Sequence, residues 1–323
     1  MNLPGSTGIP AGVSFSGPLA DKDAGAPSAC SSGAQRTPFL VDAILPPRGS
    51  RGGILPESLS SFLFRPFGRQ RTDLDFDFRS HDRPRLVTEV LTACLSDDHG
   101  SPLAASRVWS LSTSRRIASL LSLAAASESS VRRVTGRCPE EDCLQRIEFD
   151  LPIEELLALQ RRAEERDWLD WGNGEFSLRL RRPTGCDQRE WRACSFTNPL
   201  EARSAMLRSL VVEPEASPDA ARGEDRPWEE TPGLAETLEG CLDEFDPLVG
   251  FSVRTLCPHC GVETDQALDL ETLALSALER IQEQRLRDIH RLASRYHWSE
   301  SEILELSPER RARYLQWIEE GRS

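Results

Sequence analysis

Two cysteine-containing stretches determine the predicted fold, Cys138-Pro139-Glu140-Glu141-Asp142-Cys143 and Cys257-Pro258-His259-Cys260-Gly261. We call each a knuckle, a short turn that carries two cysteines, with four intervening residues in the first and two in the second. A closed tetrahedral zinc site takes two ligands from each of two such turns, with sulfur about 2.3 Å from the metal. The sequence therefore predicts a structural Zn²⁺ bound by Cys138, Cys143, Cys257 and Cys260.

The residues around the knuckles predict a split zinc ribbon, in which each knuckle joins two strands. Residues 131–135 and 251–255 contain β-branched and basic side chains, and residues 146–151 alternate between charged and apolar types. A helical pattern opens after each half, at 150–159 and at 269–278. The same order of knuckle, strand and helix is therefore expected twice.

Three other interpretations of these cysteines stay open. Unligated cysteines are common in protein cores, because Cys behaves as a small hydrophobic residue. Cys257-Pro258-His259-Cys260 is also the tetrapeptide of strongly oxidising disulfide oxidoreductases, but that chemistry requires the first cysteine at the start of a helix. Gly261 instead favours a turn, in which its positive φ lets backbone amides point at the thiolates. The third interpretation is a catalytic zinc site, in which His259 replaces one thiolate and one coordination position is open to water.

Composition and charge argue against several classes of function. Asp and Glu number 52 against 39 Lys and Arg in the 323 residues, and the net charge of -13 repels a phosphate backbone, so we expect no nucleic-acid partner. The longest apolar run, near 120–126, is shorter than the roughly 20 residues of a membrane span. No charged segment followed by an apolar one opens the chain, which predicts a reducing, cytoplasmic location where the nine cysteines form no disulfides.

The predicted fold class is α+β, a split zinc ribbon with a small β insertion, flanked by helices and preceded by a disordered tail. Residues 1–60 form the tail, because Gly, Pro, Ser and Ala dominate them. Residues 85–130 form N-terminal helices, and residues 131–266 form the split ribbon. The ribbon contains a strand-turn-helix insertion and a flexible loop at 212–233. Residues 267–323 form a C-terminal helical module.

Local patterns predict individual elements within these segments. Residues 172–174 read as the turn of a hairpin, because Gly-Asn-Gly lies between two aromatic, alternating stretches. Asp187 is expected to cap a helical turn, with Glu190 reaching back to it. Arg115 and Arg116 fall in the first turn of a helix, where cations oppose the helix dipole. This position hints at a partner carboxylate, but solvated surface is the commoner case and is expected here.

The C-terminal module has the most regular pattern. An apolar stripe from 270 to about 296 predicts an amphipathic helix. Its members are Leu278, Ile281, Leu286, Ile289, Leu292 and Tyr296. Ser299 with Glu302 predicts a capping box, and Pro308 opens a last helix. The aromatic and His side chains of this module favour a partner surface over catalysis, because neither His290 nor His297 has a nucleophile or carboxylate at a recognisable spacing.

Several stretches in a fixed order carry a family resemblance. They are Trp109-Ser110-Leu111-Ser112 with Arg115-Arg116, the pair Cys138 and Cys143, Arg182-Pro183-Thr184-Gly185-Cys186-Asp187-Gln188, Asp243-Glu244-Phe245-Asp246-Pro247-Leu248-Val249, the second knuckle, and Ile289-His290-Arg291-Leu292-Ala293-Ser294-Arg295-Tyr296-His297-Trp298-Ser299-Glu300. Together they resemble the T-even phage baseplate hub assembly chaperone family and its relatives encoded beside contractile injection systems, from about Arg85 to the C-terminus.

The resemblance implies a non-enzymatic role. A protein of this kind binds baseplate hub, spike or tail-tube proteins while a phage-tail-like contractile particle assembles. Two other functions stay open. One is a zinc-ribbon nucleic-acid or transcription accessory protein, which the acidic charge disfavours. The other is a thiol oxidoreductase built on Cys257 and Cys260, which the missing export signal disfavours.

Overall fold

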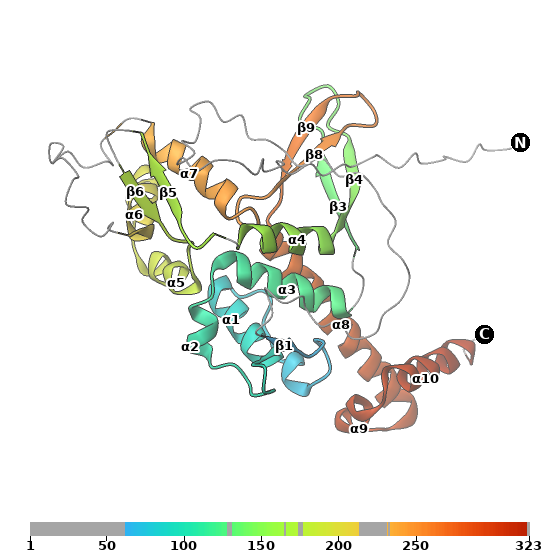
Figure 1. Cartoon of the computed structure of the whole chain (residues 1–323). Coiled ribbons are helices and arrows are strands. Elements are labelled where there is room, and N and C mark those ends of the chain that lie inside the picture. The colour runs from blue at the N-terminus through green and yellow to red at the C-terminus, as the bar shows by residue number, and fades with distance from the viewer. Residues whose placement is uncertain are drawn as a thin grey trace, which may run out of the picture. The chain divides into compact units, whose positions relative to one another are not determined.

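The computed structural model describes residues 62–127, 131–164, 166–173, 177–212, 231 and 233–321 (Figure 1). The predicted disordered tail at 1–60 lies outside the described residues. So does the predicted flexible loop at 212–233, apart from Val212, Thr231 and Gly233. No helix within these described stretches combines the length and the apolar character that a bilayer crossing requires.

The fold mixes helices with small antiparallel sheets, which confirms the α+β class. The chain forms two compact units, and each combines segments that are distant in sequence. The described residues of Val131–Arg182 and Phe196–Asp269 form what we call the ribbon unit. Those of Gly52–Ser130, Pro183–Ser195 and Leu270–Ser323 form the helical unit.

The ribbon unit contains two antiparallel hairpins. Their strands are β3 (Val131–Arg137) paired with β4 (Arg146–Pro152), and β8 (Ser252–Leu256) paired with β9 (Glu263–Ala267). In β4, Ile147, Phe149 and Leu151 are buried and the residues between them are exposed, as the period-two pattern predicts. Helix α4 (Ile153–Ala163) follows β4 and helix α8 (Leu270–Tyr296) follows β9, so the repeated order of knuckle, strand and helix is confirmed.

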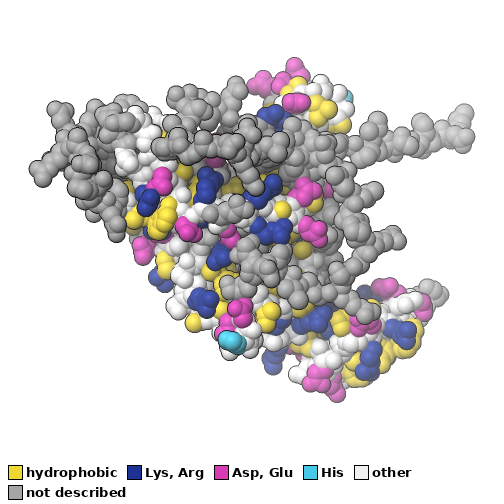
Figure 2. Space-filling model, in the orientation of Figure 1, with side chains coloured by type: hydrophobic (Ala, Val, Ile, Leu, Met, Phe, Trp, Pro, Cys, Tyr) yellow, Lys and Arg dark blue, Asp and Glu magenta, His cyan; other side chains and the backbone are white. Residues whose placement is uncertain are grey.

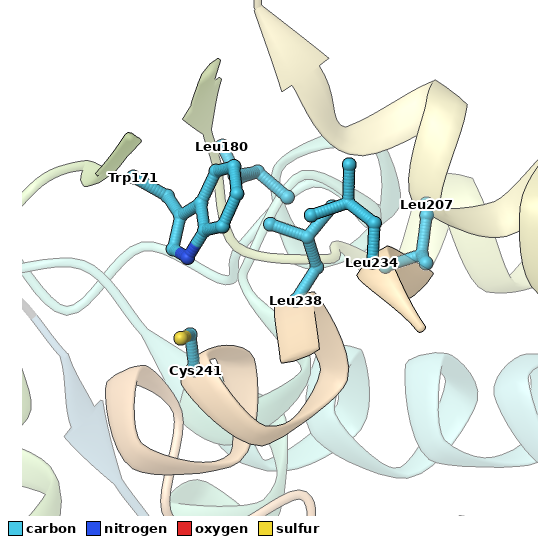
Figure 3. Close-up of a cluster of buried hydrophobic side chains, with 6 residues drawn as sticks. All are labelled: Trp171, Leu180, Leu207, Leu234, Leu238 and Cys241. Atoms are coloured by element: carbon cyan, nitrogen blue, oxygen red, sulfur yellow. The ribbon is translucent and has the colours of Figure 1, made fainter. Parts of the chain in front are cut away.

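A second layer of the ribbon unit is built from the insertion between the knuckles. Its elements are β5 (Leu169–Gly172), β6 (Ser177–Leu180), β7 (Val211–Val212), α6 (Pro199–Leu210) and α7 (Leu234–Phe245). Strand β6 pairs with β5 and β7, so the predicted hairpin is present, although Gly172 belongs to β5 and pairs with Ser177 rather than lying in the turn. One face of this sheet packs on the two helices through a buried cluster (Figure 3), made of Trp171, Leu180, Leu207, Leu234, Leu238 and Cys241.

The helical unit contains the remaining described elements. They are β1 (Leu63–Phe64), η1 (Arg71–Leu74), α1 (Arg83–Cys94), β2 (Leu95–Ser96), α2 (Ala105–Trp109), α3 (Thr113–Ser127), α5 (Gly185–Ala193), α8, α9 (Glu300–Glu305) and α10 (Pro308–Glu320). Ser299 and Glu302 form the predicted capping box at α9, and Pro308 opens α10. Helix α8 ends at Tyr296, where the apolar stripe also ends.

Arg116 is buried, and the expectation that it is solvated was wrong. It is fully enclosed in the helical unit, where Nη1 donates to Thr88 Oγ1 (3.0 Å) and to the Val108 carbonyl (3.1 Å) and Nη2 donates to the Pro84 carbonyl (2.6 Å). The guanidinium also lies 5.1 Å from the centre of the Trp109 ring. Burial lowers the pKa of Arg116 to about 10, so the side chain stays charged at neutral pH and joins α1, α2 and α3.

The start of α5 also differs from its prediction. Thr184 is the N-cap, and Asp187 is the residue that reaches back, since its carboxylate accepts from the Thr184 backbone N–H at 2.8 Å. The capping box therefore lies three residues earlier than the expected pair of Asp187 and Glu190. Gly185 then approaches Arg116 closely, because a Cβ built on it would lie 2.3 Å from Arg116 Nη1 and 2.9 Å from the Trp109 carbonyl oxygen.

One member of the predicted stripe on α8 faces solvent. Leu278, Ile281, Ile289 and Leu292 are buried, whereas Leu286 is 43% exposed. Residues on one helical face recur every three or four positions, so the buried face that includes Ile281 continues through 285 to Ile289. Leu286 lies one residue after 285 and outside this buried face, so its assignment to the core was wrong.

Candidate metal centre

The structure brings the four knuckle cysteines together within the ribbon unit. The sulfurs of Cys138, Cys143, Cys257 and Cys260 all lie within 4.8 Å of one another. Each sulfur of the first knuckle lies beside one of the second, with Cys138 Sγ 3.5 Å from Cys260 Sγ and Cys143 Sγ 3.7 Å from Cys257 Sγ. The convergence expected from the sequence is therefore present in the fold.

The two hairpins hold these knuckles at their ends. The backbone N–H of Cys138 donates to the Gln145 carbonyl at 2.9 Å, and that of Cys257 donates to the Val262 carbonyl at 2.9 Å, so each hairpin closes just before its turn. Gly261 has φ 74°, as its position after the second knuckle predicts. Leu144 occupies the matching position after the first knuckle and also has a positive φ, of 47°. Both knuckles are thus followed by a residue with positive φ.

The distances fit a tetrahedral metal ion. Four sulfurs about 2.3 Å from one ion lie about 3.8 Å from each other, close to the two cross-knuckle distances of 3.5 and 3.7 Å. A disulfide requires about 2.05 Å, and the cysteines of the described residues are free. Among these residues, the four cysteines are the group of His, Cys, Asp or Glu side chains that could hold a metal ion. Thiolate sulfur is a soft ligand, which favours zinc or iron-sulfur chemistry over Mg²⁺ or Ca²⁺.

The protein environment shifts the pKa values of two of these thiols in opposite directions. Burial raises the pKa of the Cys138 thiol to about 12, although a hydrogen bond from the backbone of Glu140 lowers it. Backbone hydrogen bonds from Cys260 and His259 lower the pKa of the Cys257 thiol to about 6, against the effect of burial. Thiolates this close repel one another, so four of them can coexist only when a positive ion lies between them.

Arg182 closes the long insertion that separates the knuckles. Its Nη2 donates to the Ala163 carbonyl (2.6 Å) at the end of α4 and to the Phe245 carbonyl (3.2 Å) at the end of α7. The guanidinium lies 3.8 Å from the centre of the Phe245 ring, and its Nε lies 3.6 Å from Asp246 Oδ1. Since α4 leaves the first hairpin and α7 leads to the second, these contacts bring the two hairpins back together.

A second contact joins the hairpins directly. Gln266 of β9 donates from Nε2 to the Arg137 carbonyl at 3.0 Å, one residue before Cys138. A Cβ at Gly136 would lie 2.5 Å from Gln266 Oε1, so the Gln266 side chain lies closely against the Gly136 backbone. Neither Arg182 nor Gln266 was predicted as a site residue, because no periodicity or motif in the sequence marks a side chain that bridges distant backbone carbonyls.

Two of the alternative interpretations lose support from the structure. Cys257 lies in a turn between β8 and β9 and not at the start of a helix, so the helix dipole that the oxidoreductase interpretation requires is absent there. His259 is exposed and lies outside the group of side chains that could hold a metal. Cys94, Cys186, Cys194 and Cys241 also lie outside that group, and Cys30 lies outside the described residues.

No family model, no curated protein and no solved structure matches this chain. The class of protein is therefore defined by its own fold and site. The chain is an α+β protein in which two hairpins, distant in sequence, bring four cysteines to a position where they could bind one metal ion.

Proposed function

We propose that the four cysteines bind one structural Zn²⁺ and that this ion ties the two hairpins into a split zinc ribbon. The convergence of the sulfurs carries the proposal, because it supplies a complete set of four thiolate ligands. Such a set leaves no coordination position for water or substrate, which is typical of structural zinc and not of catalytic zinc. The ion would hold the ribbon unit together rather than perform chemistry.

We further propose that the protein is a non-enzymatic assembly factor or component for the baseplate hub of a phage-tail-like contractile injection system. The family resemblance of the stretches from about Arg85 to the C-terminus supports this role. The closed ligand set and the exposed aromatic surface of the C-terminal helices, where Trp317 is 51% exposed, are in keeping with a protein-binding module. Its partners would be hub, spike or tail-tube proteins.

Affinity purification of the tagged full-length chain from its native cells tests this role. Mass spectrometry of the eluate should identify hub, spike or tail-tube components at a level above that of an untagged control. An eluate without any of these components, from cells that produce the particle, would contradict the role. Salt-dependent binding of the purified protein to duplex DNA would instead support the nucleic-acid accessory function.

A further inference from the structure

A groove runs between two helices of the C-terminal part of the helical unit. It has a volume of about 270 Å³ and is open to solvent on one side. Its lining residues are His290, Arg291, Ser294 and Arg295 from α8, and Trp317 and Ile318 from α10, with Gly321 at its end. Figure 2 shows basic, acidic and hydrophobic side chains together over these C-terminal helices.

The α8 wall of the groove is cationic. Its residues lie at positions i, i+1, i+4 and i+5, which places them next to one another on one helical face. Arg291 forms an ion pair across the groove with Glu319 at 2.9 Å. Arg295 is exposed and, within the described residues, has no ion pair or hydrogen bond. The groove therefore holds a positive charge that the fold does not neutralise, on a chain whose net charge is -13.

The α10 wall is apolar and carries an exposed aromatic side chain. Ile318 is buried, whereas Trp317 is 51% exposed. The Trp317 ring packs edge-on against Tyr314 with their centres 5.4 Å apart, and Tyr314 in turn packs against Trp298 at 4.9 Å. An exposed Trp held in place by its neighbours loses little conformational entropy when a partner covers it, which is why Trp is enriched in binding surfaces.

We propose that this groove binds an acidic segment of a protein partner. A Glu or Asp of that segment pairs with Arg295, whose planar guanidinium matches a carboxylate in two hydrogen bonds. A neighbouring apolar side chain of the segment covers Trp317 and Ile318. Charge complementarity selects a peptide over a nucleic acid, because Arg291 is already paired with the Glu319 carboxylate and the acidic chain repels a continuous phosphate backbone.

Fluorescence anisotropy with the full-length protein tests this inference. The probes are a panel of labelled peptides that combine Asp or Glu with Leu or Phe, neutral counterparts with Asn and Gln, and a labelled single-stranded oligonucleotide. The acidic peptides should bind more tightly than the neutral ones, and Arg295→Glu should weaken that binding about tenfold or more, the effect of losing a charge-assisted contact. Arg313→Glu is the matched control, since Arg313 is exposed on α10 but outside the groove, and should leave the affinity unchanged.

Three results would overturn the inference: no acidic peptide binding above its neutral counterpart, equal loss in both variants, or tighter binding of the oligonucleotide than of any peptide. Trp317→Ala, with its fold checked by circular dichroism, should also weaken binding. The inference rests on the proposed protein-binding role, but the two can fail separately. Hub proteins in the eluate without peptide binding would contradict only the proposal that the groove binds an acidic segment. Peptide binding without hub proteins in the eluate would contradict only the assembly role.

Discussion

At the residue scale, Cys260 gives the most direct test of the cluster. It is exposed, whereas Cys138 and Cys257 are each 1% exposed, so replacing its sulfur disturbs little packing. Cys260→Ser should lose most bound metal and lower the free energy of unfolding of the ribbon unit by several kcal/mol, because structural zinc contributes on the order of 10 kcal/mol to folding. Metal analysis and thermal denaturation check both effects.

Cys194→Ser is the matched control for that substitution. Cys194 is also exposed but lies outside the cluster, so its replacement should leave metal content and stability unchanged. Equal metal content in the two variants would show that Cys260 is not a ligand.

Gly185 should tolerate no side chain. A Cβ there would lie 2.9 Å from the Trp109 carbonyl oxygen, a backbone atom that cannot turn aside, and 2.3 Å from the buried Arg116. We expect Gly185→Ala to destabilise the helical unit by about 2 kcal/mol, as measured by chemical denaturation.

Gly240→Ala should have the opposite effect on stability. Gly240 lies inside α7 with nothing within 4 Å of a Cβ, so Ala should stabilise the helix by about 0.5–1 kcal/mol. A loss of stability at 240 equal to that at 185 would show that the close approach to Arg116 is not the cause.

The sequence predicted the metal-binding cysteines but not the burial of Arg116, for a physical reason. Metal-ligand spacing is local to each knuckle and can be read from a few residues. The acceptors of Arg116 are backbone carbonyls and a hydroxyl on other elements, and Pro84 lies 32 residues away. Any backbone carbonyl can serve this purpose, so the sequence alone does not indicate which arginine will be enclosed.

At the scale of elements, the buried cluster of the insertion determines whether its sheet and helices stay together. Leu238 of α7 is completely buried between the sheet and α6 (Figure 3). Leu238→Ala should cost about 3 kcal/mol through lost burial and the cavity left behind, measured by denaturant unfolding.

Leu200→Ala is the control for this cluster. Leu200 belongs to α6 but is 67% exposed, so its truncation should change stability by no more than about 0.5 kcal/mol. Similar losses in the two variants would contradict the packing described for the insertion.

Elements with a long apolar stripe or a recognised capping signal were predicted, whereas α6 was not. Helix α8 shows a stripe over its whole length, and α9 and α10 carry clear capping signals, so all three were confirmed. Helix α6 was not predicted, because its buried face consists of Leu207 and Leu210 alone and gives little periodicity. Its N-terminal signal was present, since Asn198 caps the helix and Pro199 follows it.

At the scale of the whole molecule, the chain passes between its two units more than once. The segment Pro183–Ser195 lies in the middle of the sequence but clusters with the helical unit. Backbone contacts hold it there, since Thr113 N–H donates to the Pro183 carbonyl at 2.8 Å and Gly185 N–H donates to the Leu111 carbonyl at 3.1 Å. Prediction from consecutive segments cannot show that a unit combines distant parts of the chain, because such a unit depends on long-range contacts.

The metal site of the ribbon unit also depends on contacts between segments that are distant in sequence. Its two hairpins are separated by the insertion, and their meeting depends on Arg182, on Gln266 and, in our account, on the bound ion. Each half contributes two cysteines, and neither half alone has a complete ligand set. A metal ion would therefore stabilise the arrangement of the whole unit and not only a local turn.

The most direct test is the metal content of the purified chain together with X-ray absorption at the zinc edge. We predict one zinc ion per chain, with four sulfur ligands at about 2.3 Å and no oxygen or nitrogen in the first shell. A folded protein without metal, or an ion with fewer than four sulfur ligands, would contradict the account.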